Sequence, residues 1–243
     1  LCEKPVDLSL ERARACRENT KASGKPIMIG FNRRFDPNFS AMKAALDAGE
    51  IGKPELLSIT SFDPAPPPIA YVKVSGGLFR DMMIHDFDMA NFMMGEAPVS
   101  IMAAGSSIVD AEIGAAGDVD TAAVTMTYAD GRICVIKNSR RAVYGYDQRV
   151  ELLGAEGLLQ AQNMLENTLV KSTAAGVTGA KPTYFFLERY MPSYAKEWGA
   201  FVDALTGGTA LPVTLDDGIT ALAMAEAATT SSKTGQPVRL ADV

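Results

Sequence analysis

Histidine and cysteine are scarce in this sequence. Its 243 residues include one His and three Cys, which are Cys2, Cys16 and Cys134. A structural zinc site needs clustered Cys and His ligands, so we expect no metal site. An odd number of cysteines without metal-ligand spacing is typical of thiols that stay reduced, and we therefore expect a cytoplasmic protein.

Basic stretches and long apolar runs are also missing. The net charge is −6, and Arg33–Arg34 and Arg140–Arg141 are the only basic doublets. Proteins that bind nucleic acids usually carry a basic patch or stripe, so we expect no nucleic-acid partner. No apolar run approaches the ~20 residues that a membrane helix needs, so we expect no membrane partner either.

The residues that are present can form a sizeable core. Apolar residues make up 47% of the sequence and charged residues 21%, which is typical of a globular protein and not of a disordered one. The first residue is Leu, and residues 1–5 resemble a strand end followed by a turn. We therefore expect the sequence to be part of a longer protein.

The first thirty residues indicate the edge of a Rossmann-type sheet. Asp7–Asn19 has apolar residues at helical spacing, and Asp7 or Ser9 can cap its start. Residues 27–31 form a short apolar run typical of a buried parallel strand. A strand end, a helix and a strand in this order predict that residues 1–31 are the remnant of a dinucleotide-binding domain.

The next segment predicts helices separated by one strand and a proline-rich loop. Asn38–Ala48 is predicted as a helix and Pro54–Ser61 as a strand. Residues 63–68, with the sequence DPAPPP, fit neither a helix nor a central strand, because proline lacks the donor and fixes φ. A helix is then expected from Gly76–Gly77 to about Met94.

The rest of the chain predicts an α+β domain over residues 32–243. Residues 99–160 contain β-rich runs broken by glycine turns, which indicates an antiparallel meander of four or more strands. Residues 161–183 look irregular, and Tyr184–Leu205 and Gly218–Ser232 are predicted helices. We expect an open, mainly antiparallel sheet with helices packed on one face.

An open sheet leaves one face without helices, and this face needs cover. Alternating residues on two predicted strands mix apolar and polar character, and we assign them to that uncovered face. We therefore expect a homodimer or homotetramer that forms through the sheet face. The alternating residues are Ala122, Val124 and Met126 on one strand, and Ile133, Val135 and Lys137 on the next.

The strongest chemical signal is the segment GGLFRDMMIHDFD at residues 76–88. Asp81 and His85 are four residues apart on the predicted helix, so their side chains project from one face. Asp88 lies near the same face, whereas Asp86 points elsewhere. A His beside a carboxylate can act as a general base near neutral pH. The alternative is a satisfied polar pair at the edge of the core.

Three weaker signals accompany this segment. Lys4, held in a turn by Pro5, follows a strand, and ligands bind at the carboxyl ends of strands in open α/β sheets. Two tyrosines in YGYDQR, at residues 144–149, can offer hydroxyl groups to a polyol. Arg33 and Arg34 can bind hydroxyls or phosphate. An exposed loop lysine, a hairpin rim and surface ion pairs are the alternative interpretations.

Taken together, these segments resemble the Gfo/Idh/MocA oxidoreductases. The family's Glu-Lys-Pro tripeptide matches residues 3–5, and its GG-x3-D-x3-H motif matches residues 76–85. The family's third motif, a glycine-rich dinucleotide loop, is not in this sequence. The segments GFNRRFDPNF, DPAPPP and SRRAVYGYDQR resemble the inositol 2-dehydrogenase branch of the family, and the resemblance extends over the whole sequence.

The resemblance implies a role for five residues. His85 resembles the base that takes the hydroxyl proton, and Asp81 resembles its partner, which hydrogen-bonds the substrate. Lys4 resembles the lysine that polarises the substrate oxygen and contacts the nicotinamide. Arg34 and Tyr146 match positions that contact the polyol. The activity implied is NAD-dependent oxidation of myo-inositol or a related cyclic polyol to the ketone.

Two alternatives to this activity stay open. One is a sugar dehydrogenase of the same family acting on glucose or a sugar derivative, and the other is an inactive binding and oligomerisation module. Similar sequences usually carry Arg where this one has Phe62, which bears on substrate preference. Because no glycine-rich phosphate loop is present, we expect this stretch of sequence alone to bind NAD poorly, with most of the NAD site in the missing N-terminal domain.

Overall fold

A computed structural model describes all of residues 1–243 and is built around a seven-stranded sheet. Every neighbouring pair of strands is antiparallel except β3 and β6, so the predicted mainly antiparallel sheet is confirmed. Across the sheet the strands are β11 (Val238–Arg239), β4 (Ser100–Ser106), β5 (Thr121–Thr127), β6 (Ile133–Ser139), β3 (Pro54–Phe62), β7 (Asp147–Gly154) and β8 (Gly157–Ala161).

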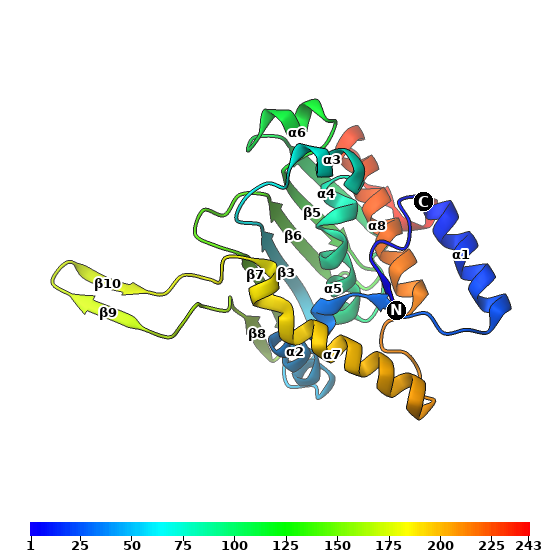
Figure 1. Cartoon of the computed structure of the whole chain (residues 1–243), viewed down its shortest axis with the longest axis horizontal. Helices are drawn as coiled ribbons and strands as arrows, with labels where there is room; N and C mark the ends of the chain where they lie inside the picture. Colours follow the sequence, from blue (N-terminus) through cyan, green and yellow to red (C-terminus); the bar gives the residue numbers. More distant parts are fainter.

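Helices cover one face of this sheet and leave the other open, as the fold class predicts (Figure 1). The helices α5 and α8 lie across the covered face, here called the inner face, while α2 packs beside β8. These helices are α2 (Pro37–Asp47), α5 (Ile84–Met94) and α8 (Leu215–Thr234), and α7 spans Phe186–Gly207. No helix combines the length and the apolar character needed to cross a bilayer.

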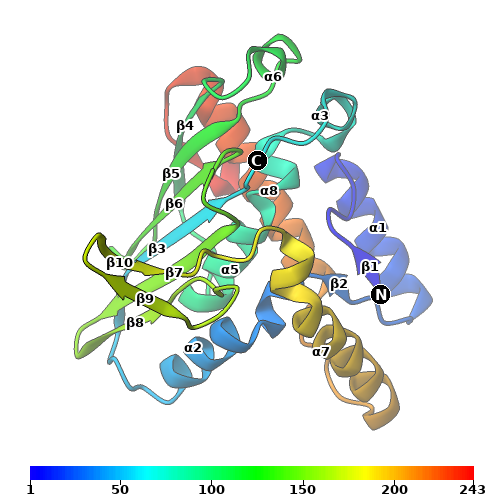
Figure 2. The ribbon, with the colours of Figure 1, turned by 60° about the vertical axis from the view of Figure 1, so that its left-hand side comes forward.

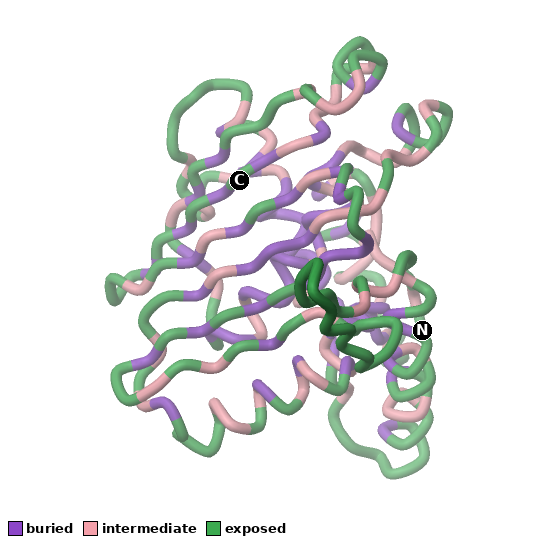
Figure 3. Tube along the Cα trace, turned by 90° about the vertical axis from the view of Figure 1, so that its left-hand side faces the viewer, coloured by how far each residue is buried: buried purple, intermediate pink, exposed green.

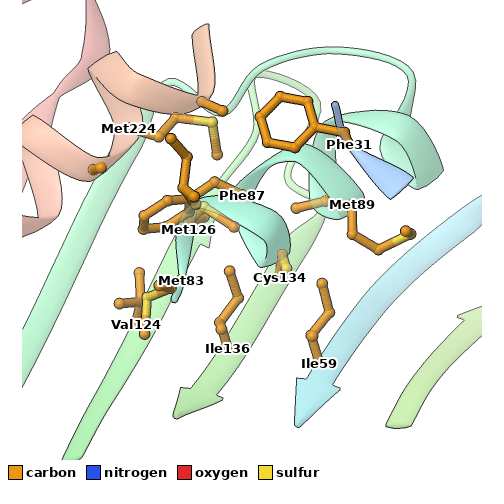
Figure 4. Close-up of a cluster of buried hydrophobic side chains, with 14 of the residues drawn as sticks. Phe31, Ile59, Met83, Phe87, Met89, Val124, Met126, Cys134, Ile136 and Met224 are labelled. Atoms are coloured by element: carbon orange, nitrogen blue, oxygen red, sulfur yellow. The ribbon is translucent and has the colours of Figure 1, made fainter. Parts of the chain in front are cut away.

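The core lies between the inner face and helices α5 and α8 (Figure 4). Ile59, Val124 and Ile136 point from three neighbouring strands toward Phe87 of α5, and all are almost fully buried. Burying a side chain of this size contributes roughly 1.5–3 kcal/mol, so the inner face holds the sheet and the helices together. Met224 of α8 joins the same cluster.

The assignment of Ala122, Val124 and Met126 to the uncovered face is wrong. All three side chains are buried and belong to the core cluster, so they point to the inner face. The strand alternates as predicted, but a period of two does not determine which of its two faces the helices cover. The uncovered face, here called the outer face, carries the residues between them, including Thr125 on β5 and the exposed Ile133 on β6.

The N-terminal residues form a small parallel pair of strands. Strand β1 (Cys2–Glu3) pairs with β2 (Ile29–Gly30), and helix α1 (Leu10–Ser23) connects them, as expected for a βα unit. Of the two predicted caps, Ser9 starts the helix, because its hydroxyl accepts the backbone N–H of Arg12. This unit packs against α8, where Gly218 leaves room for a neighbouring side chain.

The predicted helix from Gly76–Gly77 to Met94 is broken in two. A short helix α4 (Leu78–Asp81) ends before α5, and the backbone N–H of Met83 donates to the carbonyl of Leu78 five residues earlier, at 2.9 Å. Such π-type turns shift the helical register and are often found at functional sites. Asp81 and His85 therefore lie on two helices rather than on one face of a single helix.

Residues 161–183, expected to be irregular, contain an extended hairpin. Strands β9 (Val170–Thr173) and β10 (Gly176–Gly179) pair with each other and with no other strand. Two further helices, α3 (Ile69–Ser75) and α6 (Ala111–Ala115), are short. Residues 63–68 are neither helix nor strand, as predicted.

Candidate active site

A cavity of about 640 Å³ opens at the end of β3. Its walls are the proline-rich loop 63–68, the break between α4 and α5, the first turns of α7, and Lys4 after β1. A volume between roughly 300 and 1,000 Å³ is typical of sites for small molecules. The structure brings Lys4, Asp81, His85 and Tyr146 to this cavity from separate parts of the chain.

Asp81 is held by three donors. Lys4 Nζ lies 3.3 Å from Oδ1, the Tyr71 hydroxyl donates to Oδ1 at 2.7 Å, and Arg140 Nη2 donates to Oδ2 at 3.1 Å. Burial favours the neutral acid, but the charge of Lys4 and the hydrogen bonds of Tyr71 and Arg140 outweigh it, so the pKa of Asp81 is lowered. The carboxylate is therefore ionised and fixed in direction.

His85 lies beside this group without a hydrogen bond to Asp81. It is half-buried, its ring meets Phe31 edge-on at 6.1 Å between centroids, and its Nδ1 atom has no hydrogen-bond partner. Burial, with the nearby charges of Lys4 and Arg33, lowers the pKa of His85 well below its ordinary value. The imidazole is therefore neutral at neutral pH and able to accept a proton.

Lys4 links the small N-terminal sheet to the cavity. Its ammonium group donates to the main-chain oxygen of Asp81 at 2.5 Å as well as facing the carboxylate. Burial lowers the pKa of Lys4, while Asp81 opposes this shift. Lys4 thus offers a cation, held in place from one side, to any ligand that occupies the cavity.

The two neighbouring arginines have different positions. Arg33 lines the cavity, and its Nη1 donates to the buried Asp86 at 2.5 Å. Arg34, the one expected to contact a polyol, does not line the cavity. Its Nε donates to Asp88 at 2.9 Å, and its Nη2 lies 3.0 Å from Asp217. Arg34 therefore links the segment after β2 to helices α5 and α8 through ion pairs.

Tyrosines form another part of the cavity wall. Tyr146 is buried and packs edge-on against Tyr190 of α7, with 6.0 Å between ring centroids. Both rings line the cavity together with Tyr194. Tyr144, the other tyrosine of the YGY segment, does not line it, because its hydroxyl donates to Asp147 at 2.6 Å.

Asp63 of the proline-rich loop lines the cavity, whereas Phe62, the last residue of β3, does not. Asp63 Oδ2 lies 3.4 Å from Arg140, and burial raises the pKa of Asp63 to about 6. Phe62 pairs across the sheet with Ser139 and Asp147, is absent from the cavity lining, and alternates with the inward-facing Ser61. Phe62 therefore points to the outer face and does not make the cavity apolar.

Several polar atoms around the cavity have no partner within the protein. Asn32 Nδ2, Arg140 Nε and the Tyr190 hydroxyl are buried and unpaired, as is His85 Nδ1. Buried polar groups are nearly always hydrogen-bonded, so a group of unpaired atoms at one cavity indicates a polar ligand. The sequence interpretation missed Tyr71, Asp63 and Tyr190, and it noted Arg140 only as a basic doublet.

A scan against family models matches residues 39–160 to the GFO/IDH/MocA C-terminal domain. The chain is 48% identical over 242 residues to the myo-inositol 2-dehydrogenase of Thermotoga maritima, covering 100% of this chain and 72% of that protein.

Solved structures agree with this match. A myo-inositol dehydrogenase from Corynebacterium glutamicum superposes with a TM-score of 0.94 at 42% identity, covering 98% of this chain and 72% of that one. A scyllo-inositol dehydrogenase from Lactobacillus casei, solved with bound NAD(H) and scyllo-inositol, has a TM-score of 0.90 at 28% identity, with 98% and 72% covered.

Proposed function

Because this chain belongs to the Gfo/Idh/MocA oxidoreductase family, we propose that it carries the substrate-binding and catalytic part of an NAD-dependent inositol 2-dehydrogenase. The observation that carries the proposal is the juxtaposition of Lys4, Asp81 and His85 at one polar cavity. In this proposal, residues 1–31 belong to a dinucleotide-binding domain and residues 32–243 form the substrate domain.

The residues around Lys4 fit a nicotinamide cofactor. Lys4 follows β1 of a parallel pair, which is where ligands bind in open α/β sheets, and Asn32, whose buried Nδ2 has no partner within the protein, lines the same cavity. When bound, the nicotinamide supplies the acceptor for the hydride of the alcohol C–H bond, a role that no side chain can fill. Lys4 and the end of β1 would hold it against the substrate.

His85 takes the hydroxyl proton in this proposal. Oxidation of a secondary alcohol releases one hydride from carbon and one proton from oxygen, and a neutral imidazole can accept the proton. The lowered pKa of His85 keeps it neutral, and because His85 lines the cavity its ring can meet a substrate hydroxyl there. The ketone oxygen then forms beside the Lys4 ammonium, which stabilises the negative charge that develops on it.

Asp81 positions Lys4 instead of acting as a base. Its carboxylate is occupied by Lys4, Tyr71 and Arg140, so it fixes the ammonium of Lys4 and keeps the charges balanced. One of its lone pairs remains able to accept a substrate hydroxyl, since each carboxylate oxygen can accept two hydrogen bonds.

A cyclic polyol fits the polar lining better than a less hydroxylated substrate. A cyclitol offers hydroxyl groups all round its ring, and each buried polar group left unpaired costs ~1–3 kcal/mol. Tyr146, Tyr190, Asp63 and Arg33 line the cavity and offer partners to such hydroxyls. Phe62, which bears on substrate preference, lies on the outer face, so it supports no preference for a less hydroxylated substrate.

The working enzyme is, in this proposal, a cytoplasmic homodimer or homotetramer that forms through the outer face. The support is the exposed apolar side chains that this face carries, among them Leu56, Ile133 and Leu153. Three free cysteines are consistent with a reducing compartment.

The test is transfer of deuterium. The full-length gene product is incubated with NAD⁺ and myo-inositol deuterated at carbon 2, and the nicotinamide is analysed by mass spectrometry. The proposal predicts a deuterated NADH and an inosose. Reduction without deuterium, or no reduction of NAD⁺, would overturn it.

A further inference from the structure

Residues 107–120 connect β4 to β5, and we call them the β4–β5 loop. The loop contains the short helix α6, which lies beside α3 at one end of the molecule (Figure 2). Most of α6 is exposed (Figure 3). The loop ends in Asp118 and Asp120, however, and these two residues contact segments that contribute side chains to the cavity. The exposed loop therefore reaches the candidate active site through its last residues.

Asp120 fixes the β4–β5 loop to the sheet. Its side chain is fully buried, and its carboxylate accepts backbone N–H groups from three consecutive residues of the same loop. Hydrogen bonds to an ionised acceptor are roughly twice as strong as those between neutral groups. The loop is therefore held in one conformation next to β5. The three donors are Ile108, Val109 and Asp110, at 3.1, 2.8 and 3.0 Å.

The main chain of Asp120 positions Arg140. The backbone N–H of Arg140 donates to the Asp120 carbonyl at 2.8 Å, directly after β6 ends. The Arg140 side chain is buried, and its Nη2 donates to Asp81 Oδ2 at 3.1 Å. The loop therefore fixes the backbone from which this guanidinium reaches Asp81.

Asp118 contacts the helix that carries Asp81. Its Oδ1 accepts the backbone N–H of Leu78 at 2.9 Å, at the start of α4, and Asp81 is the last residue of that helix. The first N–H groups of a helix have no partner within the helix, and the residue before Leu78 is a glycine without a side chain to cap it. Asp118 therefore replaces the missing N-cap residue from a position forty residues away.

The second glycine of the GG motif makes room for this contact. Gly77 has a φ of 86°, which favours glycine, and a Cβ there would lie 2.7 Å from Asp118 Oδ1. A larger residue at position 77 would push the carboxylate away from the N–H of Leu78. Gly77 and Asp118 are therefore required together.

Helix α4 depends on such support from outside. It is four residues long and ends in the π-type turn at Met83, and isolated helices this short are not stable in water. Lys4 contacts both the main-chain oxygen and the carboxylate of Asp81. A displacement of α4 would therefore also move the group that holds Lys4.

We propose that Asp118 is a positioning residue, which caps α4 and so holds Asp81 where Lys4 and Arg140 both reach its carboxylate. The Asp120 carbonyl holds Arg140 in the matching position, so one loop fixes both members of the Asp81–Arg140 ion pair. The effect of Asp118 on the reaction rests on the function proposed above, whereas its effect on α4 does not.

The first test separates the position of the Asp118 oxygen from its charge. Asp118→Ala removes the acceptor, and Asp118→Glu keeps the charge but displaces it by one methylene group. Asp118→Asn loses the charge but keeps an oxygen for Leu78, and it breaks no other hydrogen bond because Oδ2 has no partner. Glu112→Ala is the matched control, since Glu112 is an exposed acidic residue of the same loop.

Hydrogen exchange followed by mass spectrometry measures the effect on α4 in the full-length gene product. In a peptide spanning residues 76–85, exchange should be several-fold faster in Asp118→Ala and Asp118→Glu than in wild type. Asp118→Asn and Glu112→Ala should exchange as wild type does. Unchanged exchange in the Ala and Glu variants, or equally fast exchange in Asp118→Asn, would overturn the capping contact.

The pH profile of kcat/KM for myo-inositol tests the link to the reaction. Against the effect of burial, Lys4 and the hydrogen bonds of Tyr71 and Arg140 lower the pKa of Asp81. When α4 shifts, these contacts weaken and that pKa rises, so the acidic limb of the profile should move to higher pH in Asp118→Ala. The value at neutral pH should fall by up to ~10²-fold.

Asp118→Asn should restore both the acidic limb and the rate, whereas a loss of global stability alone would not move the limb. Faster exchange with an unchanged profile in Asp118→Ala would overturn the role of Asp118 in the reaction. A wild type without this activity would overturn the proposed function and that role with it. Because hydrogen exchange needs no catalysis, it would still decide whether Asp118 caps α4.

Discussion

The two faces of the seven-stranded sheet are built from alternate residues of the same strands, yet they have different roles. On β5, Val124 and Met126 point inward and are fully buried, whereas Thr125 and Thr127 between them point outward and are exposed. The inner face packs the helices that carry Asp86 and His85. The outer face combines exposed apolar residues such as Ile133 with charged residues such as Arg149 and Glu151.

The largest effect should come from the inner side, at His85. In the full-length gene product, His85→Ala should lower kcat by roughly 10²–10⁴, the range for losing a general base. Steady-state oxidation of myo-inositol measures this. Asn91→Ala is the control, because Asn91 lies on the same helix with its side chain against Met224. A fall in kcat of less than about threefold in a folded His85→Ala variant would reject the role of His85.

Adjacent residues on β5 should differ sharply in their effect on stability. Met126→Ala opens a cavity in the core and should cost about 2–5 kcal/mol in the free energy of unfolding. Thr125→Ala, one residue away on the outer face, should change it by less than about 0.5 kcal/mol. Denaturant unfolding of both variants makes the comparison. Equal losses would mean that the two faces are not divided as described.

A charge on the outer face should act on assembly and not on folding. Ile133→Asp places a carboxylate in the apolar part of that face and should lower the oligomeric mass, because an unpaired buried charge is costly. Ile108→Asp is the matched control, since Ile108 is also exposed but lies off the sheet. Light scattering gives the mass. The same mass for both variants would exclude the outer face as the interface.

The smallest effect concerns a carboxyl group buried in α7. Glu197 is buried, its Oε1 has no partner, and burial followed by the charge of Glu3 raises its pKa to about 7 from 4.5. The unfolded carboxyl ionises first, so wild type loses stability as pH rises from about 4.5 to 7.

Replacing this carboxyl should remove that loss. Glu197→Gln stays neutral, and each kcal/mol recovered above about pH 7 raises the Tm by roughly 2–4 °C. Below about pH 4, where the carboxyl is protonated in both the folded and the unfolded state, the variant and wild type should melt together. Thermal unfolding at both pH values tests this, and an equal difference at the two would show that Glu197 does not ionise in that interval.

Much of the fold could be predicted, because local patterns decide it. Helices α2, α7 and α8 begin and end within three residues of the predicted bounds, where caps such as Thr214 at the start of α8 mark them. The parallel pairing of β3 with β6 could not be predicted, since the two strands are seventy residues apart in the sequence and no turn fixes their register.

The broken helix shows why the site was harder to predict than the fold. Met82 and Met83 are good helix formers, so nothing local signals a break. Leu78 donates its backbone N–H to Asp118 at 2.9 Å, and a Cβ at Gly77 would lie 2.7 Å from the same carboxylate. The two glycines did signal a close approach, but its partner lies forty residues further along the chain.

Two residues that are adjacent in the sequence also differ in whether they reach the cavity. Lys4, Asp81, His85 and Tyr146 reach the cavity, but Arg33 lines it in place of Arg34. A single turn of 3₁₀ helix over Asn32–Phe35 determines where the Arg33 and Arg34 side chains point. One turn is too short to be predicted from hydrophobic periodicity. Tyr190 comes from a distant helix and carried no local signal.

We propose that the cavity on the inner side of the sheet oxidises a cyclic polyol. The most direct test is kcat/KM for myo-inositol, scyllo-inositol and glucose, measured with NAD⁺ on the full-length gene product under one set of conditions. A cavity that binds a cyclic polyol should give a higher value for myo-inositol than for glucose. A higher value for glucose than for both inositols would contradict it.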